Sequence, residues 1–255
     1  MLLKNKTALI TGASAGIGES IAEIFAENGA NLILLARREE RLIKLKENLK
    51  KKYGTESHII VCDIRNYNRL QEEISRIDKE LKKVSILINN AGMARGLNKI
   101  QDSSVQDWDE TIDTNIKGLL YVTNLLLPYL LKKKSAHIVN IGSMAGYEVY
   151  PGGNVYCATK FALKGLSKAM QLDLQGTGVK VTNIAPLLVE TEFSNVRFYG
   201  DLEKAKQAYS GYNPLKAKDI AEITLFTVTR PHNVMIQEVI VTPTDKPSAL
   251  AVSKN

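Results

Sequence analysis

The sequence is poor in the residues that build disulfides and metal sites. Its 255 residues include only two cysteines, Cys62 and Cys157, and three histidines at positions 58, 137 and 232. Two cysteines make no disulfide framework, and the histidines are too scattered for the spacing of metal ligands. We therefore expect neither a metal site nor structural disulfides.

Long apolar runs are missing as well. The chain runs almost directly into an expected strand at Ala8–Ile10, which leaves no room for the regions of a signal peptide. The longest nearly apolar stretch, 118–131, contains Asn124 and Pro128 and is shorter than the roughly 20 residues that span a bilayer. These absences predict a cytoplasmic protein with no membrane partner.

No proline-rich or low-complexity linker divides the chain, and its charge is unevenly balanced, with a formal net charge of +7. The lysines gather in 44–52, 79–83 and 132–134, without interleaved aromatic residues. This pattern favours solvated helix faces over a nucleic-acid site, and attraction of anionic substrates is a weaker alternative. In the absence of a linker, we expect a single domain over residues 1–255.

Short apolar runs alternate with amphipathic stretches along the chain. The runs predict strands at Ala8–Ile10, Leu32–Leu35, His58–Cys62, Ile86–Ile88, His137–Ile141, Lys180–Ile184 and Val239–Val241. The amphipathic stretches predict helices at Ile17–Asn28, Glu39–Lys52, Tyr67–Leu81, Val105–Leu131, Val155–Gln175 and Lys218–Thr229. Continuous apolar strands separated by helices require a parallel sheet covered on both faces. The sequence thus predicts a single-domain α/β fold, a Rossmann-type doubly wound sheet of about seven parallel strands.

A glycine-rich stretch, TGASAGIG, follows the first predicted strand, at the sheet edge where such folds bind ligands. Gly12, Gly16 and Gly18 permit a tight turn and let a pyrophosphate approach the amides that open the next helix. The stretch therefore predicts a dinucleotide site that includes the intervening residues, which are Ser14, Ala15 and Ile17. The alternative is a plain strand-to-helix connection.

Two arginines, Arg37 and Arg38, end the second predicted strand, where an acidic residue would bind the ribose 2′-hydroxyl of NAD. Two guanidinium groups suit a 2′-phosphate instead, and Ser14 adds a hydrogen-bond donor. The alternative is that the arginines merely begin the next helix, but cations oppose the helix dipole there. The pattern predicts NADP rather than NAD.

Small and polar residues follow the third and fourth predicted strands, at the same edge of the sheet. Asp63 and Ile64 follow the third strand, and Asp63 is expected to accept a hydrogen bond from adenine or, alternatively, to cap the next helix. Asn90, Ala91 and Gly92 close the fourth strand with a turn that suits packing against the cofactor's ribose.

Tyr156 and Lys160 lie four residues apart on one predicted helix and therefore share a face. A nearby ammonium lowers the pKa of a tyrosine, ordinarily about 10, toward the range useful for acid–base catalysis. Ser143 ends the fifth predicted strand, close enough to converge with Tyr156 on one carbonyl oxygen. Two other pairs with this spacing lack such a serine or enclose a proline, so we expect them to be surface features.

These motifs, in this order, resemble the short-chain dehydrogenase/reductase family over nearly the whole chain. Asn115, within the sequence DTNIKG, matches that family's helix asparagine, so the resemblance implies a catalytic tetrad of Asn115, Ser143, Tyr156 and Lys160. In the implied mechanism, Ser143 and Tyr156 hydrogen-bond the substrate oxygen, Tyr156 transfers the proton, and hydride passes between the substrate and the nicotinamide. The resemblance also implies that Lys160 binds the nicotinamide ribose and that Asn115 positions a proton-relaying water.

The stretch after the sixth predicted strand completes the expected cofactor site. Val189 and Thr191 match the family segment that contacts the nicotinamide carboxamide. The family usually has Pro-Gly where this chain has Pro186 and Leu187. Glycine allows unusual backbone angles, so we expect Leu187 to narrow the pocket or shift the loop while Pro186 and Leu187 still border the cofactor.

A narrower resemblance is to the branch that contains NADP-dependent 3-hydroxy acid dehydrogenases, which oxidise serine and allo-threonine and reduce malonic semialdehyde. It rests on Gly152–Tyr156, on Thr191–Phe198 and on the tail near Pro243. The resemblance implies a homotetramer in which the helices at Val105–Leu131 and Val155–Gln175 make the subunit contacts. The alternative is that these helices only cover the sheet.

A 3-hydroxy acid needs a cation for its carboxylate. Arg197, on a segment at 192–212 that we expect to be mobile, is the first candidate, and Arg95 is the second. We therefore predict an NADP-dependent oxidoreductase acting on a small 3-hydroxy acid or on its 3-oxo or semialdehyde counterpart. The alternatives are a 3-oxoacyl carrier-protein reductase, a general carbonyl reductase and, in a different class, a non-catalytic NADP-sensing protein.

Overall fold

Seven parallel strands form one sheet in the computed structural model, which describes residues 1–250. Their order is β3-β2-β1-β4-β5-β6-β9. Their bounds are β1 Thr7–Thr11, β2 Asn31–Ala36, β3 Ser57–Val61, β4 Val84–Asn89, β5 Ala136–Ile141, β6 Val179–Pro186 and β9 Glu238–Val241. The strand order reverses between β1 and β4, the place where doubly wound sheets bind ligands. The prediction of a Rossmann-type sheet of seven strands is confirmed.

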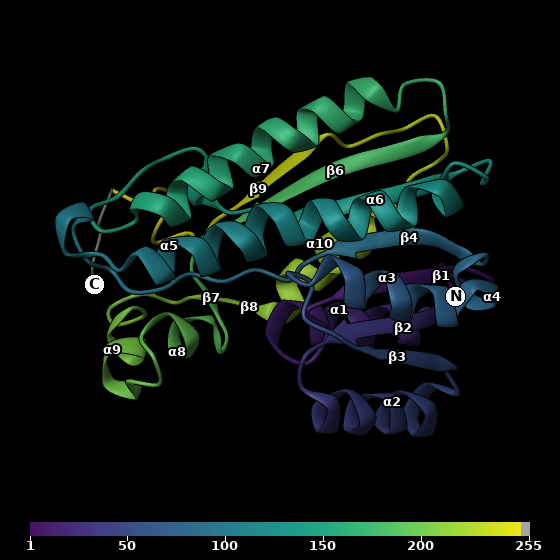
Figure 1. Cartoon of the computed structure of the whole chain (residues 1–255), viewed down its shortest axis with the longest axis horizontal. Coiled ribbons are helices and arrows are strands. Elements are labelled where there is room, and N and C mark those ends of the chain that lie inside the picture. The colour runs from purple at the N-terminus through teal and green to yellow at the C-terminus, as the bar shows by residue number, and fades with distance from the viewer. Residues whose placement is uncertain (251–255) are drawn as a thin grey trace.

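Helices cover both faces of the sheet (Figure 1). One face packs against α1 (Gly16–Glu27), α2 (Glu39–Tyr53) and α10 (Ala217–Val228). The other packs against α3 (Tyr67–Arg76), α4 (Asp78–Leu81), α6 (Leu119–Leu130) and α7 (Asn154–Asp173), so the helix predicted over Tyr67–Leu81 is two helices. In β1, Ala8 and Ile10 point into the first core and Leu9 into the second. Burial on both sides explains why the strands are continuously apolar.

The helix predicted over Val105–Leu131 is interrupted. α5 (Val105–Ile112) leads into a π-helical turn, η2 (Asp113–Gly118), before α6 begins. Asn115 lies in this turn, and its buried side chain accepts a hydrogen bond from the amide of Met93 and donates one to the carbonyl of Met93, both at 2.8 Å. The π turn thus brings Asn115 into contact with the loop after β4. Turns of this kind often occur at functional sites.

Residues 187–216, which we call the edge segment, fold into short elements at the carboxyl edge of the sheet. They are β7 (Val189–Glu190), α8 (Phe193–Arg197), α9 (Leu202–Gln207) and β8 (Leu215–Lys216), with β7 and β8 paired in parallel. Two 3-10 turns, η1 (Ile100–Asp102) and η3 (Met144–Gly146), lie after β4 and β5. No helix within residues 1–250 combines the length and the apolarity needed to cross a membrane.

Candidate active site

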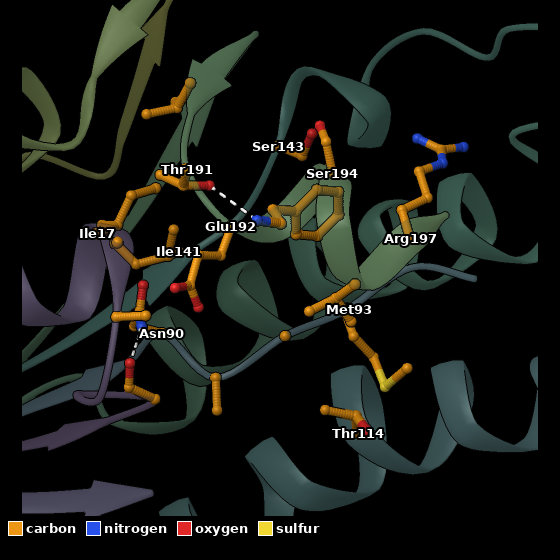
Figure 2. A pocket seen from close by; sticks show the side chains of 18 of the residues that line it. Ile17, Asn90, Met93, Thr114, Ile141, Ser143, Thr191, Glu192, Ser194 and Arg197 are labelled. Carbon is orange, nitrogen blue, oxygen red and sulfur yellow. Dashed lines mark hydrogen bonds between the residues drawn. The ribbon is translucent and has the colours of Figure 1, made fainter. Parts of the chain in front are cut away.

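A cavity of about 610 Å³ opens at the carboxyl edge of the sheet. Figure 2 shows Ile17 and Asn90 near one end of it and Arg197 near the other. Of the site residues predicted from the sequence, all line this cavity except Gly18, Asn115 and the second carboxylate candidate, Arg95. One hollow therefore gathers motifs that are widely separated in the sequence, at the edge expected from the strand pattern.

The side chain of Asn90 holds the glycine loop after β1 in place through hydrogen bonds. The side-chain amide of Asn90 donates hydrogen bonds to the carbonyls of Thr11 at 2.9 Å and Gly12 at 3.3 Å. Gly12 has a φ of +66°, which favours glycine. A Cβ at Gly18 would lie 2.5 Å from the Asn90 amide nitrogen, so Gly18 serves the loop by packing beneath it rather than by lining the cavity.

The first turn of α1 faces the cavity and has no side-chain cap. Ala15, Gly16 and Ile17 all line the cavity, and no side chain hydrogen-bonds the amides at this helix start. Free amides and the helix dipole together favour an anionic group. The glycine loop has no room for a Cβ at Gly18, and the helix that follows it has no side-chain cap. Both features fit the pyrophosphate of a dinucleotide.

Two arginines lie at the rim beside this loop. Arg38 precedes α2 and donates from Nε to the hydroxyl of Ser14 at 3.2 Å. Arg37 lies 3.6 Å from the carboxylate of Asp63, and 59% of its side chain is exposed. Arg37, Arg38 and Ser14 all line the cavity, and their N–H and O–H donors are of the kind that binds a phosphate.

Asp63 lines the cavity but is occupied by a neighbour. Its carboxylate accepts hydrogen bonds from the backbone and guanidinium of Arg65, the shortest at 2.7 Å. Burial raises the pKa of Asp63, but the hydrogen bonds from Arg65 outweigh it and hold this pKa below its usual range. The alternative role as a helix cap is wrong, because Asn66 caps α3 by accepting from the amide of Arg69.

Ser143 and Tyr156 meet at the inner end of the cavity. Ser143 precedes η3 and accepts a hydrogen bond from the amide of Ala145 at 3.1 Å. Burial raises the pKa of Tyr156 well above its usual value, although the hydrogen bond with Ser143 and the charge of Arg197 lower it in part. The prediction of a lowered pKa is therefore wrong for the protein alone, because desolvation outweighs the neighbouring positive charges.

Lys160 is only 7% exposed, and its Nζ donates to the carbonyl of Ile141 at 2.9 Å. Its ammonium lies 5.9 Å from the centre of the Tyr156 ring, so the two residues share a face as predicted. Burial lowers the pKa of Lys160 to about 8. A Cβ at Gly92 would lie 3.7 Å from this Nζ, an ordinary van der Waals distance, so Gly92 lies directly beside the ammonium.

Asn115 lies behind the cavity wall rather than in it. Besides its two bonds to Met93, its side-chain amide donates to the hydroxyl of Thr159 at 3.0 Å. Thr159 immediately precedes Lys160 on α7, so Asn115 ties the loop after β4 to the helix that carries Tyr156 and Lys160. This contact supports a positioning role for Asn115.

Arg197 reaches the cavity from the last residue of α8. Its Nε donates to the carbonyl of Gly96 at 2.9 Å and its Nη1 to the hydroxyl of Tyr150 at 3.0 Å. Its guanidinium carbon lies 5.6 Å from the centre of the Tyr156 ring. Arg95, the second candidate, does not line this cavity and instead pairs with Glu110 at 3.0 Å.

The departure at Leu187 affects its neighbour. Leu187 lines the cavity and donates its amide to the carbonyl of Val241 at 2.8 Å. The residue with the left-handed backbone is Leu188, at a φ of +50°, and it also lines the cavity. In this loop the left-handed conformation is therefore at position 188 and not at position 187.

Several cavity residues escaped the sequence analysis. Phe193 packs on Tyr156 with ring centres 5.6 Å apart, and Tyr150 supports Arg197. Glu192 on the edge segment pairs with Arg38, and Lys246 reaches the wall from the C-terminal tail. Glu192 and Phe193 lie within the stretch Thr191–Phe198 that carries the narrower resemblance, but that resemblance gave them no role of their own. No motif marks Tyr150 or Lys246.

Comparison with known proteins places the chain among enzymes. A model of the family described as short chain dehydrogenase matches residues 6–199. The NADP-dependent 3-hydroxy acid dehydrogenase YdfG of Salmonella typhimurium is 44% identical over 92% of this chain and 94% of its own length. Sulfoacetaldehyde reductase 2 of Chromohalobacter salexigens is 42% identical over 97% of this chain and 98% of its own.

A solved structure agrees with the sequence relatives. The closed form of serine dehydrogenase complexed with NADP+ has a TM-score of 0.90 and 41% identity to this chain, covering 98% of it and 100% of the solved chain. The predicted likeness to 3-hydroxy acid dehydrogenases is thereby confirmed. The chain belongs to the short chain dehydrogenase family, and the class of enzyme predicted from the sequence, an oxidoreductase, is confirmed.

Proposed function

We propose that this protein transfers hydride between NADP and a small 3-hydroxy acid, or its 3-oxo or semialdehyde counterpart. The observation that carries the proposal is the single cavity shared by the glycine loop, Ser143, Tyr156, Lys160 and Arg197. The two relatives named for NADP-dependent 3-hydroxy acid and serine oxidation support the same substrate class.

The cofactor fits the donors along the wall of the cavity. Arg37, Arg38 and Ser14 would hold the 2′-phosphate, and the glycine loop with the start of α1 would hold the pyrophosphate. Lys160 would hold the nicotinamide ribose, and Thr191 with Val189 the carboxamide. When bound, the nicotinamide supplies or accepts the hydride.

Proton transfer falls to Tyr156. Because burial keeps its pKa high, the phenol is protonated at neutral pH, ready to donate to the oxygen of a carbonyl as it is reduced. Ser143 provides a second hydrogen bond to that oxygen. Lys160 places a positive charge beside the ring, which favours the phenolate that forms when the proton leaves.

The side chain of Asn115 has little hydrogen-bonding capacity left for a water molecule. Its two amide protons go to Met93 and Thr159, and its oxygen accepts once from Met93. One lone pair of that oxygen remains to accept from a water. We propose that Asn115 acts mainly by fixing the loop after β4, with any proton relay passing through this one acceptor.

Arg197 would bind the substrate carboxylate. A guanidinium has five N–H donors, and Arg197 uses one Nε–H on Gly96 and one Nη1–H on Tyr150. The remaining N–H groups include both on Nη2, which suit a carboxylate. The relative named sulfoacetaldehyde reductase suggests that a sulfonate could use the same donors.

The predicted homotetramer also belongs to this proposal. α5 contacts α7 (Figure 1). Apolar side chains on and next to α5, α6 and α7 are exposed. The exposed residues are Val105, Leu120, Leu131, Phe161 and Leu172. Light scattering after gel filtration should give four times the mass of the chain, and a monomer would contradict the assembly. A cytoplasmic location stays a prediction from the sequence.

The test follows absorbance of the reduced nicotinamide with NADP or NAD as the oxidant. The substrates for oxidation are L-serine, L-allo-threonine, 3-hydroxyisobutyrate and a secondary alcohol. A 3-oxoacyl thioester is tested in the reverse direction, with NADPH as the reductant. We expect NADP-linked oxidation of the small acids. Activity confined to the neutral alcohol or the thioester would contradict the acid specificity and favour the carbonyl reductase or carrier-protein alternatives, and no turnover would favour the NADP-sensing one.

Arg197→Ala gives the sharper test of the substrate site. We expect KM for the acid to rise by about 10- to 100-fold, because charge-assisted hydrogen bonds are lost. The KM of a neutral secondary alcohol should stay the same. Arg197→Lys keeps the charge without the planar fork and should fall between the two. Equal effects on acid and alcohol would mean that Arg197 only supports the fold of the edge segment.

A further inference from the structure

A carboxylate bridge joins the edge segment to α2 at the rim of the cavity. Glu192, which precedes α8, accepts hydrogen bonds from Nη1 of Arg38 at 2.8 Å and from Nη1 of Arg41 at 2.7 and 2.8 Å. Arg38 in turn donates to Ser14 in the glycine loop. The bridge therefore connects three parts of the chain around the place proposed for the 2′-phosphate.

Arg38 and Arg41 share the one negative charge of Glu192, whose pKa is lowered by their hydrogen bonds. Arg37 is paired separately, with Asp63 at 3.6 Å. Arg38 uses its Nε–H on Ser14 and an Nη1–H on Glu192, so its other N–H groups remain for a 2′-phosphate. The carboxylate and the phosphate can therefore share the Arg38 guanidinium through different N–H groups.

Arg41 is the bridge residue whose replacement changes the bridge without changing the cavity wall. Arg38 lines the cavity and would contact the phosphate itself, whereas Arg41 lies outside the cavity wall. The hydrogen bonds described for the Arg41 side chain within residues 1–250 both go to Glu192. Arg41 therefore tests the bridge at a residue that does not itself line the cofactor cavity.

The five residues of α8 connect Glu192 to the part of the cavity that contains Tyr156 and Arg197. Phe193, directly after Glu192, packs on the ring of Tyr156, and Arg197 at the far end of α8 bonds Gly96 and Tyr150. α8 thus lies over the cavity with Glu192 fastened at one end and Arg197 at the other. Loss of the Glu192 bridge would free the end nearest the cofactor's phosphate.

We infer that Glu192 and Arg41 form a latch that fastens α8 to α2 across the cofactor cavity and slows dissociation of the dinucleotide. Both are positioning residues, because they act by holding α8. The bridge is partly exposed, and single exposed ion pairs contribute little, but a shared carboxylate with two arginines forms a network. The inference rests on the proposed NADP cofactor only for its kinetic part.

The kinetic test measures NADPH release by stopped-flow fluorescence in the absence of substrate. We expect Glu192→Gln to raise the dissociation rate of NADPH by about three- to tenfold, because the carboxylate charge is lost while the shape is kept. Glu203→Gln is the control, since it removes a charge from the same segment and, among residues 1–250, the ion pair of Glu203 is with Lys206 in the same helix. An unchanged rate overturns the latch. A slower rate also overturns it, because Glu192 would then compete with the phosphate.

A double-mutant cycle tests the pairing. Arg41→Ala should raise the release rate by no more than Glu192→Gln does, since Arg38 still bonds Glu192. The double variant should release NADPH no faster than Glu192→Gln alone, because Arg41 then has no carboxylate left to bond. Additive effects would overturn the pairing. Circular dichroism of each variant checks that the fold is intact.

A second readout needs no cofactor. Hydrogen–deuterium exchange of peptides covering residues 193–207 should be faster in ligand-free Glu192→Gln than in wild type or Glu203→Gln. Equal exchange would overturn the latch independently of the cofactor. If exchange speeds up but NADPH does not bind the wild-type protein, the fault lies in the proposed function and the latch stands.

Discussion

The glycine loop and the edge segment face the same cavity but are built by different means. In the first, buried backbone and side-chain groups are bonded together: the Thr11 hydroxyl donates to Ile88 and accepts from the amides of Asn90 and Ala91. In the second, partly exposed side chains hold short helices, as Glu192 does with Arg38. The proposed pyrophosphate site thus depends mainly on the path of the backbone, whereas the proposed 2′-phosphate and carboxylate sites depend on replaceable side chains.

The largest effect should follow from Tyr156→Phe. Loss of the phenolic proton should lower kcat by about 10²- to 10⁴-fold, since general acid–base groups contribute on that scale. The Kd of NADPH, measured by its fluorescence, should change by less than about threefold, because the cofactor's phosphates bind elsewhere. A matching loss of NADPH affinity would show that the two regions are not separable.

Lys160→Met should change stability in a pH-dependent way. The Lys160 pKa of about 8 lies below that of an unfolded lysine, about 10.4, so the unfolded chain binds more protons between these values. Wild-type stability should therefore rise relative to Lys160→Met, by about 3 kcal/mol, from pH 8 to 10.5. Urea unfolding across this range measures it, with the exposed Lys168→Met on the same helix as the control. A difference that is flat with pH would mean that Lys160 is well solvated.

Arg38→Ala should weaken NADPH binding by about 10- to 100-fold, since charge-assisted hydrogen bonds to the 2′-phosphate are lost. NADH binding should change far less, because NADH lacks that phosphate. Arg69→Ala is a matched control: its side chain is 47% exposed against 44% for Arg38, and it lies outside the cavity. Equal losses for the two cofactors would argue against recognition of the phosphate by Arg38.

The smallest expected effects are on the free energy of unfolding, and they compare the glycine loop directly with the edge segment. Thr11→Val leaves the amides of Asn90 and Ala91 without their acceptor and should lower the free energy of unfolding by about 1–3 kcal/mol. Ser194→Ala removes one hydrogen bond, to the Tyr209 hydroxyl, and should cost less than about 1 kcal/mol. Thermal and urea denaturation measure both. An equal or larger cost at Ser194 would reverse the comparison.

The sequence predicts the sheet, its helices and most of the cavity wall because those parts follow local rules. Apolar runs place the strands, and the carboxyl ends of parallel strands must meet, so Gly12, Asn90 and Ser143 fall at one edge. The short elements of the edge segment have no such signal, since helices of five or six residues show little periodicity.

Contacts between distant residues are the second limit. Glu192 pairs with an arginine 154 positions earlier, and Asn115 with a backbone 22 positions earlier, so neither partner appears in a local pattern. The same limit explains the direction of the Tyr156 pKa. The spacing to Lys160 reveals a helpful charge, but only the packed structure reveals how much water the ring has lost.

The π turn at 113–118 has a consequence for how this chain tolerates changes of length. A π turn closes its hydrogen bond one residue later than an α turn, so the helix after it is rotated by about 100° relative to an unbroken α-helix. Deletion of one residue here could restore an ordinary helix while leaving Leu126 and Leu130 in the core. Asn115 would then turn away from Met93. A single-residue deletion at this turn would therefore uncouple the loop after β4 from α7, which carries Tyr156 and Lys160.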